Sequence, residues 1–202
     1  AEVREGGHGF SGRTVTPVAI ALYGLGIAIK NQDLRDGVLG CVASWASESA
    51  LRNYVIYPLV GRLRPDPDRG HSDDNSPVGA EEGDQYVFYA PGGGWGKQSI
   101  PAGHVANVAA CASFLGNRFH MGVVEPALYA LAAGVGVGRM ADRRHWASDT
   151  MLGFVLGYAV GRNTALRSAR RLRNGQSPIS TDHGLLLRPG QAGVNIGWEW
   201  AF

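Results

Sequence analysis

Apolar residues occur along most of the chain in blocks of helical length, and short polar or glycine-containing stretches separate the blocks. Thr16 as an N-cap and Pro17 at the first helical position predict a helix that continues to about Lys30. Asp33 is the expected cap of a second helix over residues 34–57. The first part of the chain is therefore predicted to be a pair of helices.

Three further helices are predicted in the second half of the chain. They cover residues 102–115 with Gly116 as the stop, Glu125-Pro126 to Arg139, and Asp149 to about Leu172 with Ser148 as the cap and Asn174-Gly175 as the stop. We therefore predict an all-α fold, a helical bundle of five to six helices. We expect residues 1–202 to form a single domain, because a chain of 202 residues can bury a sizeable core.

Two segments depart from the helical pattern. Residues 65–100 are rich in Gly, Pro and Asp, and a connection this long is usually functional or disordered, so we expect it near a pocket entrance. The tail, residues 176–202, is predicted to be rich in strand. Alternate positions near its end are apolar: Val194, Ile196, Trp198, Trp200 and Phe202. This period predicts a short C-terminal β-hairpin or strand packed on the helices, with attachment to a membrane or partner as the alternative.

Composition and charge add little to this picture. The chain is 45% hydrophobic and carries a net charge of +2. The charge is uneven, because residues 162–173 hold five arginines and no acid. A basic helix end suits a phospholipid surface, and a solvated helix face favoured by the helix dipole is an equal alternative. No interleaved aromatic residues or known module accompany these arginines, so we expect no nucleic-acid partner.

The N-terminus and the cysteines bear on the compartment. The chain begins at Ala1 without methionine, which suggests removal of a signal peptide or trimming, and we expect an exported, periplasmic or envelope-associated bacterial protein. The apolar stretches are shorter than the ~20 residues that cross a bilayer, so a soluble or peripheral domain is favoured. Cys41 and Cys111 either form a disulfide or remain two buried thiols.

Three short motifs carry the chemistry. They are Arg64-Pro65, Pro101-Ala102-Gly103-His104, and Arg139 with His145 and Asp149 at the spacing R-x5-H-x3-D. Two arginines can hold a phosphoryl group, because each offers a planar fork of donors and a permanent charge. One histidine can attack phosphorus when an acceptor holds its other nitrogen, and a second can protonate the leaving oxygen. The motifs therefore indicate metal-free phosphoryl transfer through a histidine nucleophile.

At these residues the chain resembles the type 2 phosphatidic acid phosphatases, a superfamily shared with bacterial acid phosphatases and vanadium haloperoxidases. The family pattern is K-x6-R-P, then P-S-G-H, then S-R-x5-H-x3-D, and the resemblance covers roughly residues 40–162. It implies helices that converge on one pocket. The roles it implies are phosphate binding by Arg64, Arg139 and the amide of Gly103, general acid catalysis by His104, and a phosphohistidine at His145 oriented by Asp149.

Three residues depart from the family pattern. Tyr57 stands in the place of the lysine, and Ala102 and Gly138 stand in the places of the two serines. Tyr57 can offer one O–H to a phosphate but no charge, and Ala102 offers no hydroxyl. Losing a charged contact to phosphate costs roughly 1.5–3 kcal/mol, so weaker activity is expected unless another cation compensates. Lys97 and Arg62 are the candidates, although solvated surface charges are the more common role for such residues.

The leading hypothesis is a metal-independent phosphatase, without cofactor, that hydrolyses a phosphate monoester or a lipid (pyro)phosphate through a phosphohistidine. The partner would be a phosphorylated lipid or a small phosphate ester, with peripheral membrane contact. The alternative is a catalytically weakened phosphate- or lipid-binding homologue at the envelope. A vanadium-dependent haloperoxidase is less favoured, because the chain is small and the missing lysine and serine would weaken bound vanadate. The motifs give no support to the remaining histidines, which are expected to be surface or core residues: His8, His71, His120 and His183.

Overall fold

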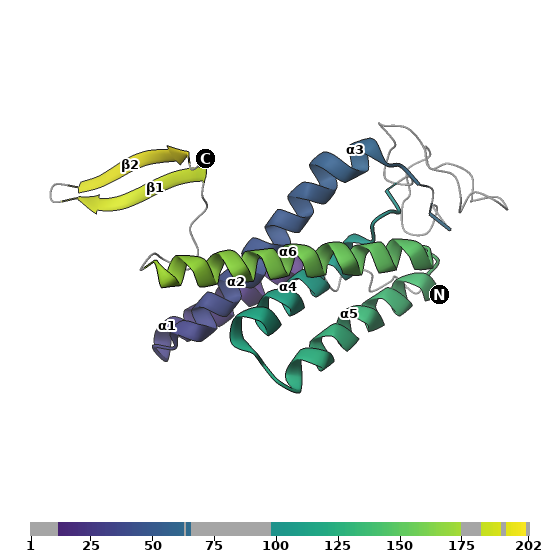
Figure 1. The fold of residues 1–202 in the computed structure, drawn as a ribbon, viewed down its shortest axis with the longest axis horizontal. Helices are drawn as coiled ribbons and strands as arrows, with labels where there is room; N and C mark the ends of the chain where they lie inside the picture. Colours follow the sequence, from purple (N-terminus) through teal and green to yellow (C-terminus); the bar gives the residue numbers. More distant parts are fainter. Residues whose placement is uncertain (1–11, 63, 66–97, 175–182, 191–192, 201–202) are drawn as a thin grey trace, which may run out of the picture.

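The computed structural model describes residues 12–62, 64–65, 98–174, 183–190 and 193–200. Helices dominate these residues, as Figure 1 shows, and the all-α prediction is confirmed. The helix α1 (Gly12–Ala28) precedes one long rod made of α2 (Gln32–Leu51), the π-helical η1 (Arg52–Ile56) and α3 (Tyr57–Leu59). The remaining helices are α4 (Gly103–Phe119), α5 (Val124–Ala141) and α6 (Ala147–Arg173).

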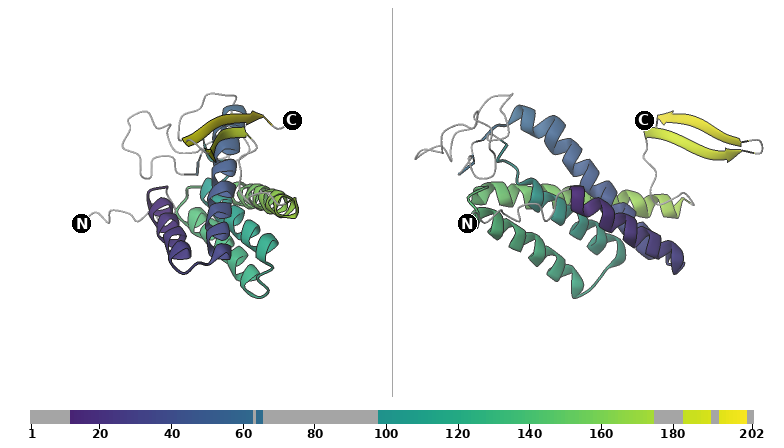
Figure 2. Two further views of the ribbon diagram at one scale, coloured as in Figure 1. Left: turned by 90° about the vertical axis from the view of Figure 1, so that its left-hand side faces the viewer. Right: turned by 180° about the vertical axis from the view of Figure 1, so that it is seen from behind.

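The central helix of the bundle is α4. It packs against α2, α5 and α6, and most extensively against α6. Its side chains are small or apolar on most sides, and Val105, Ala106 and Phe114 are fully or almost fully buried. In Figure 2, α1 and α6 lie at opposite sides of the bundle with α2 between them. A close-packed helix with neighbours on three sides holds the residues of its first turn in a fixed position.

A stripe of glycines brings α6 against α4. Gly153, Gly157 and Gly161 recur at four-residue intervals and therefore lie on one face of α6. A Cβ at Gly157 would overlap the carbonyl oxygen of Ala106, and a Cβ at Gly161 would overlap that of Ala110. Only residues without a side chain permit this approach. The contact fixes the N-terminal end of α6 beside the N-terminal end of α4.

A disulfide joins α2 to α4. It links Cys41 and Cys111, which are 70 residues apart in the sequence. The structure therefore has the disulfide and not the two thiols that the sequence also allowed. Because α2 continues into η1 and α3, the bond ties that whole rod to the central helix.

The first two helices begin differently from the prediction. Pro17 lies inside α1 and not at its first position. Because proline has no amide proton, the helix lacks one hydrogen bond at Pro17. The cap of α2 is Asn31, whose Oδ1 accepts a hydrogen bond from the N–H of Leu34 at 2.9 Å. The prediction of Asp33 as the cap is therefore wrong. The left-handed backbone of Lys30 (φ 54°) ends the preceding connection and leaves Asn31 extended at the cap position.

The helices α4, which carries His104, and α6, which begins two residues after His145, also differ at their ends. Gly116 does not stop α4, which continues to a left-handed His120 (φ 50°). Gly116 instead lies against the side chain of Glu125, so close packing explains the absence of a side chain. The helix α6 begins two residues earlier than predicted, and Trp146 is its N-cap. Ser148 is consequently inside the helix and is not its cap.

The C-terminal residues contain two strands, β1 (His183–Gly190) and β2 (Gly193–Trp200). They pair antiparallel, with His183 opposite Trp200 and Gly190 opposite Gly193. The side chains of this hairpin lie outside the described part of the structure, so its predicted packing on the helices stays a prediction. Residues 66–97, which make up most of the expected pocket loop, also lie outside the described residues.

Several helices expose apolar side chains. On α1 and directly after it, the exposed ones are Val18, Ile20, Leu22, Leu25, Ile27 and Ile29. Val137 on α5 and Met151 and Val155 on α6 are exposed as well. Within the described ranges, no helix combines the length and the apolar character that a membrane crossing requires.

Candidate functional site

The ends of four elements meet at one end of the bundle, on the right-hand side of Figure 1: the end of α3, the start of α4, the end of α5 and the start of α6. Backbone bonds join them. Gln98 forms a parallel bridge with Arg62, and the N–H of Ser99 donates to the carbonyl oxygen of Arg62 at 3.2 Å. The N–H of Ala102 donates to the carbonyl oxygen of Asp149 at 2.9 Å. These contacts bring the three sequence motifs to one place.

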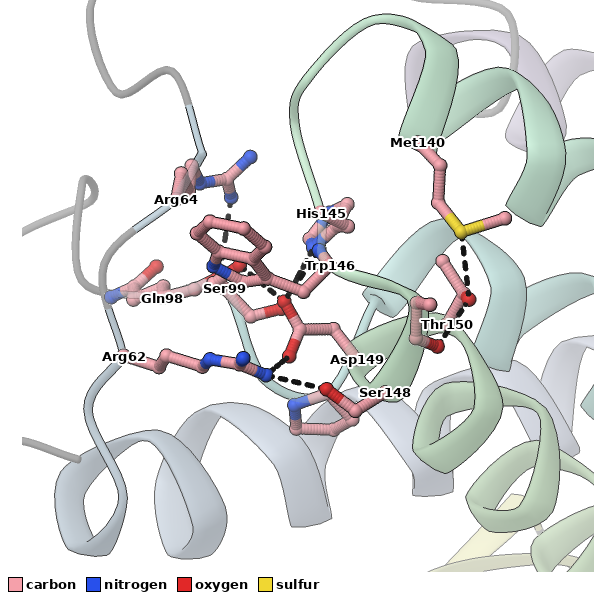
Figure 3. A network of polar contacts seen from close by, with 12 residues as sticks. Arg62, Arg64, Gln98, Ser99, Met140, His145, Trp146, Ser148, Asp149 and Thr150 are labelled. Atoms are coloured by element: carbon pink, nitrogen blue, oxygen red, sulfur yellow. Dashed lines mark hydrogen bonds and ion pairs between the residues drawn. The ribbon is translucent and has the colours of Figure 1, made fainter. Parts of the chain in front are cut away.

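The carboxylate of Asp149 is fully buried and lies between Arg62 and Ser99 in Figure 3. It accepts hydrogen bonds from Nη1 of Arg62 at 2.6 Å, from Oγ of Ser99 at 2.5 Å and from the N–H of Trp146 at 3.0 Å. Arg62 also donates to the hydroxyl of Ser148 at 2.6 Å and is only 4% exposed. The expectation that Arg62 is a solvated surface charge is therefore wrong. Its guanidinium balances the buried charge of Asp149.

The ring of His145 is held by a backbone carbonyl. Nδ1 lies 2.7 Å from the carbonyl oxygen of Ser99, and since a carbonyl only accepts, Nδ1 carries the proton. The unprotonated Nε2 is then the nitrogen available for attack. Nδ1 is 4.0 Å from Oδ2 of Asp149, which is longer than a hydrogen bond. Asp149 therefore acts on the ring through Ser99, whose hydroxyl it binds, and not by the direct contact that the resemblance implied.

The imidazole of His145 is neutral at physiological pH. Burial lowers its pKa to about 2, and the nearby charges of Arg64 and Arg139 act in the same direction. A neutral imidazole with a fixed tautomer is the form that a nucleophile requires.

His104 lies in the first turn of α4 and is partly buried. Burial lowers its pKa to about 4, and the positive charges around it lower the pKa further in the same sense. Those charges belong to Arg139, Arg52, Arg64 and Arg144. The orphan amides at the start of α4 add a positive potential at this point, which favours a bound anion. His104 and His145 thus share one positively charged environment.

Guanidinium groups that are buried or partly buried lie near the two histidines. Arg64 is 5% exposed, and its Nη2 donates to the carbonyl oxygen of Gln98 at 3.2 Å. Burial lowers the pKa of Arg64 to about 10; Tyr57 and Asp149 oppose this shift, while Arg139 and Arg144 reinforce it. Burial and the charge of Arg144 likewise lower the pKa of Arg139. Cations that repel one another in a buried site favour binding of an anion, and phosphate fits their donor geometry.

The three departures from the family pattern differ in their surroundings. The hydroxyl of Tyr57 donates to the carbonyl oxygen of Pro101 and accepts from Nη1 of Arg52, both at 3.2 Å. Its one proton is therefore already used within the protein. Ala102 is fully buried as the N-cap of α4 and offers no side-chain donor. Gly138 has open space where a Cβ would stand, so packing does not demand glycine there.

Three residues of the site were missed by the sequence reasoning. Ser99 precedes the second motif, Arg144 precedes His145, and Arg52 is five residues before Tyr57. The run Arg143-Arg144 was the one visible signal, because two adjacent cations stand inside the third motif. Ser99 and Arg52 carry no comparable signal, since their positions depend on how distant segments meet.

The remaining polar candidates lie elsewhere. His120 is exposed at the opposite end of α4 from His104, and His183 begins β1. His8, His71 and Lys97 fall outside the described residues, so Lys97 as a compensating cation stays a prediction.

A cavity of about 750 Å³ lies between α1, α2, α4 and α5. Its walls are almost entirely apolar and include Val18, Leu22, Leu34, Val42, Trp45 and Leu131. Asn107, which follows His104 by about one turn of α4, is also part of its lining. The cavity therefore extends away from the histidines along the central helix.

Two comparisons with known proteins found a similarity. The family model described as the PAP2 superfamily matches residues 37–173. The chain is also similar to a lipid A 1-phosphatase of Porphyromonas gingivalis, with 38% identity over 74 residues. That match covers 34% of this chain and 16% of the relative, so the chain spans a small part of the relative's length. No solved structure matches the chain.

Proposed function

Because the chain belongs to the PAP2 superfamily, we propose that it is a metal-independent phosphatase with His145 as its nucleophile. The observation that carries the proposal is a buried neutral imidazole with a fixed tautomer, set among guanidinium groups that repel one another. A phosphate dianion relieves that repulsion and brings phosphorus to Nε2. The guanidinium groups supply the positive charge that a metal ion supplies in other phosphatases.

The proposed reaction has two steps. Arg64, Arg139 and the amide of Gly103 hold the phosphoryl oxygens while Nε2 of His145 attacks phosphorus. The bond from phosphorus to the leaving oxygen breaks as protonated His104 donates its proton to that oxygen. Water then attacks the phosphohistidine and gives a proton to His104. The bond between phosphorus and Nε2 breaks, so inorganic phosphate is released and His145 is again neutral.

We propose a lipid phosphate or pyrophosphate as the substrate in preference to a small soluble ester. The apolar cavity begins at Asn107, about one turn of α4 beyond His104, and has a volume suited to part of an acyl or prenyl chain. Exposed apolar side chains on α1 and the arginines near the end of α6 suit contact with a phospholipid surface. The similar protein from Porphyromonas gingivalis is named for a phosphorylated lipid, which supports the same choice.

We further propose that the protein works outside the reducing cytosol, in the periplasm or elsewhere in a bacterial envelope. The disulfide between Cys41 and Cys111 supports this location, because disulfides persist in oxidising compartments.

The test is phosphate release in EDTA from phosphatidic acid, a prenyl pyrophosphate, lipid A and p-nitrophenyl phosphate. We expect turnover, with the highest kcat/KM on a lipid. His145→Asn should lower kcat roughly a thousandfold or more, because the nucleophile is lost. His120→Asn is the matched control, since His120 is exposed and asparagine tolerates its left-handed backbone. Strict dependence on a divalent metal, or full activity in His145→Asn, would contradict the proposal.

The departures at Tyr57 and Ala102 favour one alternative, a weakened homologue that binds a phosphorylated lipid without turnover. Neither residue offers the phosphate a free side-chain donor in this structure. The same panel separates the two functions. Saturable binding of a lipid phosphate without phosphate release would establish the alternative.

A further inference from the structure

Arg52 is a cation at the site that the family pattern does not contain. It is the first residue of η1, at the end of α2, and its side chain is only 12% exposed. Its Nε donates to Oε1 of Glu48 at 2.9 Å, and its Nη1 donates to the hydroxyl of Tyr57 at 3.2 Å. Glu48 is fully buried. The guanidinium is therefore fixed in place from two sides.

The guanidinium of Arg52 lies directly against the first turn of α4. A Cβ at Gly103 would stand 2.5 Å from Cζ of Arg52 and 2.7 Å from its Nη1. A side chain at this position would displace the guanidinium from where it lies. The charge of Arg52 is consequently beside the orphan amides at the start of α4 and close enough to His104 to lower its pKa.

The π-helical turn explains how this cation reaches the site. In a π-helix the N–H of residue i+5 bonds to the carbonyl of residue i, and here the N–H of Tyr57 donates to the carbonyl oxygen of Arg52. Residues 52 and 57 therefore lie one above the other on the same face of the rod. A side chain at position 52 can therefore reach the space that the lysine of the family pattern would occupy from position 57.

We propose that Arg52 binds the phosphate of the substrate, in place of the lysine that Tyr57 replaces. The inference rests on the proposed function and names a residue that the family pattern does not assign. Tyr57 becomes a positioning residue, because its hydroxyl accepts a hydrogen bond from Arg52 and donates its own proton to the carbonyl oxygen of Pro101.

The donors of Arg52 are suited to this role. Apart from Glu48, its partners are neutral oxygens: Tyr57 OH, Ser49 Oγ at 3.3 Å from Nη2, and Asn53 Oδ1 at 3.1 Å from Nη1. A charged phosphate oxygen accepts a shorter and stronger bond than these neutral acceptors do, so it displaces the weaker of them. The bond to Glu48 fixes Nε and leaves the outer edge of the guanidinium to the ligand.

The first test is the affinity for vanadate, measured by calorimetry, together with kcat and KM on the best substrate of the panel. Arg52→Gln should weaken vanadate binding and raise KM by about tenfold or more, which corresponds to one lost charged contact. The double variant Arg52→Gln/Tyr57→Lys should recover most of both losses, because it restores the lysine of the family pattern. Arg35→Gln, near the start of the same helix α2, is the control and should change neither quantity.

A second variant covers the case in which Arg52→Gln misfolds because buried Glu48 loses its partner. Glu48→Gln/Arg52→Gln removes both charges together and should fold, yet should show the same loss of vanadate affinity. Loss of the Arg52 charge should also raise the pKa of His104, because only Arg139, Arg64 and Arg144 then remain around it. The pH profile of activity should therefore shift towards higher pH. A purely structural arginine would not produce that shift.

The outcomes separate the two proposals. Unchanged vanadate affinity in folded Arg52 variants, or no recovery by Tyr57→Lys, overturns the role of Arg52. A wild-type protein that binds vanadate through Arg52 but shows no turnover keeps this inference and overturns the phosphatase activity. A wild-type protein that neither binds vanadate nor releases phosphate overturns both.

Discussion

The carboxylate of Asp149 accepts hydrogen bonds from Arg62, Ser99 and the backbone of Trp146, and none of these donors is a histidine. Ser99 links it to His145, because the Ser99 hydroxyl binds the carboxylate while the Ser99 carbonyl accepts from Nδ1. The orientation of His145, the proposed nucleophile, therefore depends on a serine that belongs to no motif. The carboxylate of Asp149, paired with buried Arg62, holds the hydroxyl of that serine in place.

Ser99→Ala tests this arrangement. The substitution removes one donor from a buried carboxylate, which costs about 1–3 kcal/mol of stability and loosens the segment that carries the carbonyl. We expect kcat to fall roughly tenfold with KM little changed, because the arginines that we propose bind the phosphate are untouched. The control is Ser113→Ala. Ser113 is equally buried, but its hydroxyl donates to the carbonyl oxygen of Tyr158, away from the site. A rise in KM with kcat unchanged would contradict the positioning role.

The pH dependence of His104 gives a second residue-scale prediction. A general acid must be protonated, and because the pKa of His104 is lowered to about 4, its protonated fraction in the free enzyme falls as pH rises above that value. An alkyl phosphate needs this proton, whereas p-nitrophenolate leaves without it. We expect the ratio of kcat/KM for the two substrates, alkyl over aryl, to fall steadily from pH 4 to 8. Taking the ratio cancels the pH dependence that comes from titration of the substrates' phosphate groups. A ratio that does not change with pH would show that His104 is not the general acid.

Short motifs were enough to predict which arginines and histidines the fold brings to one site. Arg64, His104 and His145 stand in patterns whose spacing reflects the chemistry itself. Ser99 and Arg52 could not be found in this way. Their roles depend on the bridge between residues 62 and 98 and on a π-helical turn, neither of which leaves a sequence signal.

At the scale of the elements, the glycine face of α6 sets the distance between the two helices that carry His104 and Asp149. Gly157→Ala should destabilise the protein by about 1–3 kcal/mol, because its Cβ would overlap the backbone of Ala106. Gly134→Ala in α5 is the matched control. Its Cβ meets open space, so the helix should gain roughly 0.5–1 kcal/mol. Equal unfolding free energies for both variants in denaturant titrations would refute the close contact of α4 and α6.

The helices themselves were predictable, while their ends were not. Apolar blocks and proline or glycine boundaries predicted five helices in the right order. Gly116 failed as a stop because it is needed for contact with Glu125, and Asp33 failed as a cap because Asn31 already satisfies Leu34. In both cases packing or a local turn decided between two residues of similar preference, which one sequence does not reveal.

At the scale of the whole molecule, the disulfide closes a segment of 70 residues that includes Arg52, Arg64 and His104. In the chain-entropy estimate, a loop of this length contributes about 4 kcal/mol to stability. Cys41→Ala/Cys111→Ala should therefore unfold at clearly lower denaturant concentration than the wild type. Reducing agent should lower the midpoint of the wild type alone. Identical midpoints for the wild type and the variant under oxidising conditions would show that the bond does not contribute.

The central claim is a covalent phosphohistidine at His145, and acid-labile label on that residue tests it most directly. The wild type, His104→Asn and His145→Asn are mixed with p-nitrophenyl phosphate carrying labelled phosphate, quenched in alkali within milliseconds, digested and analysed by mass spectrometry. We predict phosphate on the peptide that contains His145 and none in His145→Asn. The amount should be larger in His104→Asn, because p-nitrophenolate leaves without the acid while the water that completes the reaction lacks its base. Label on another residue, or rapid turnover without any labelled protein, would contradict the account.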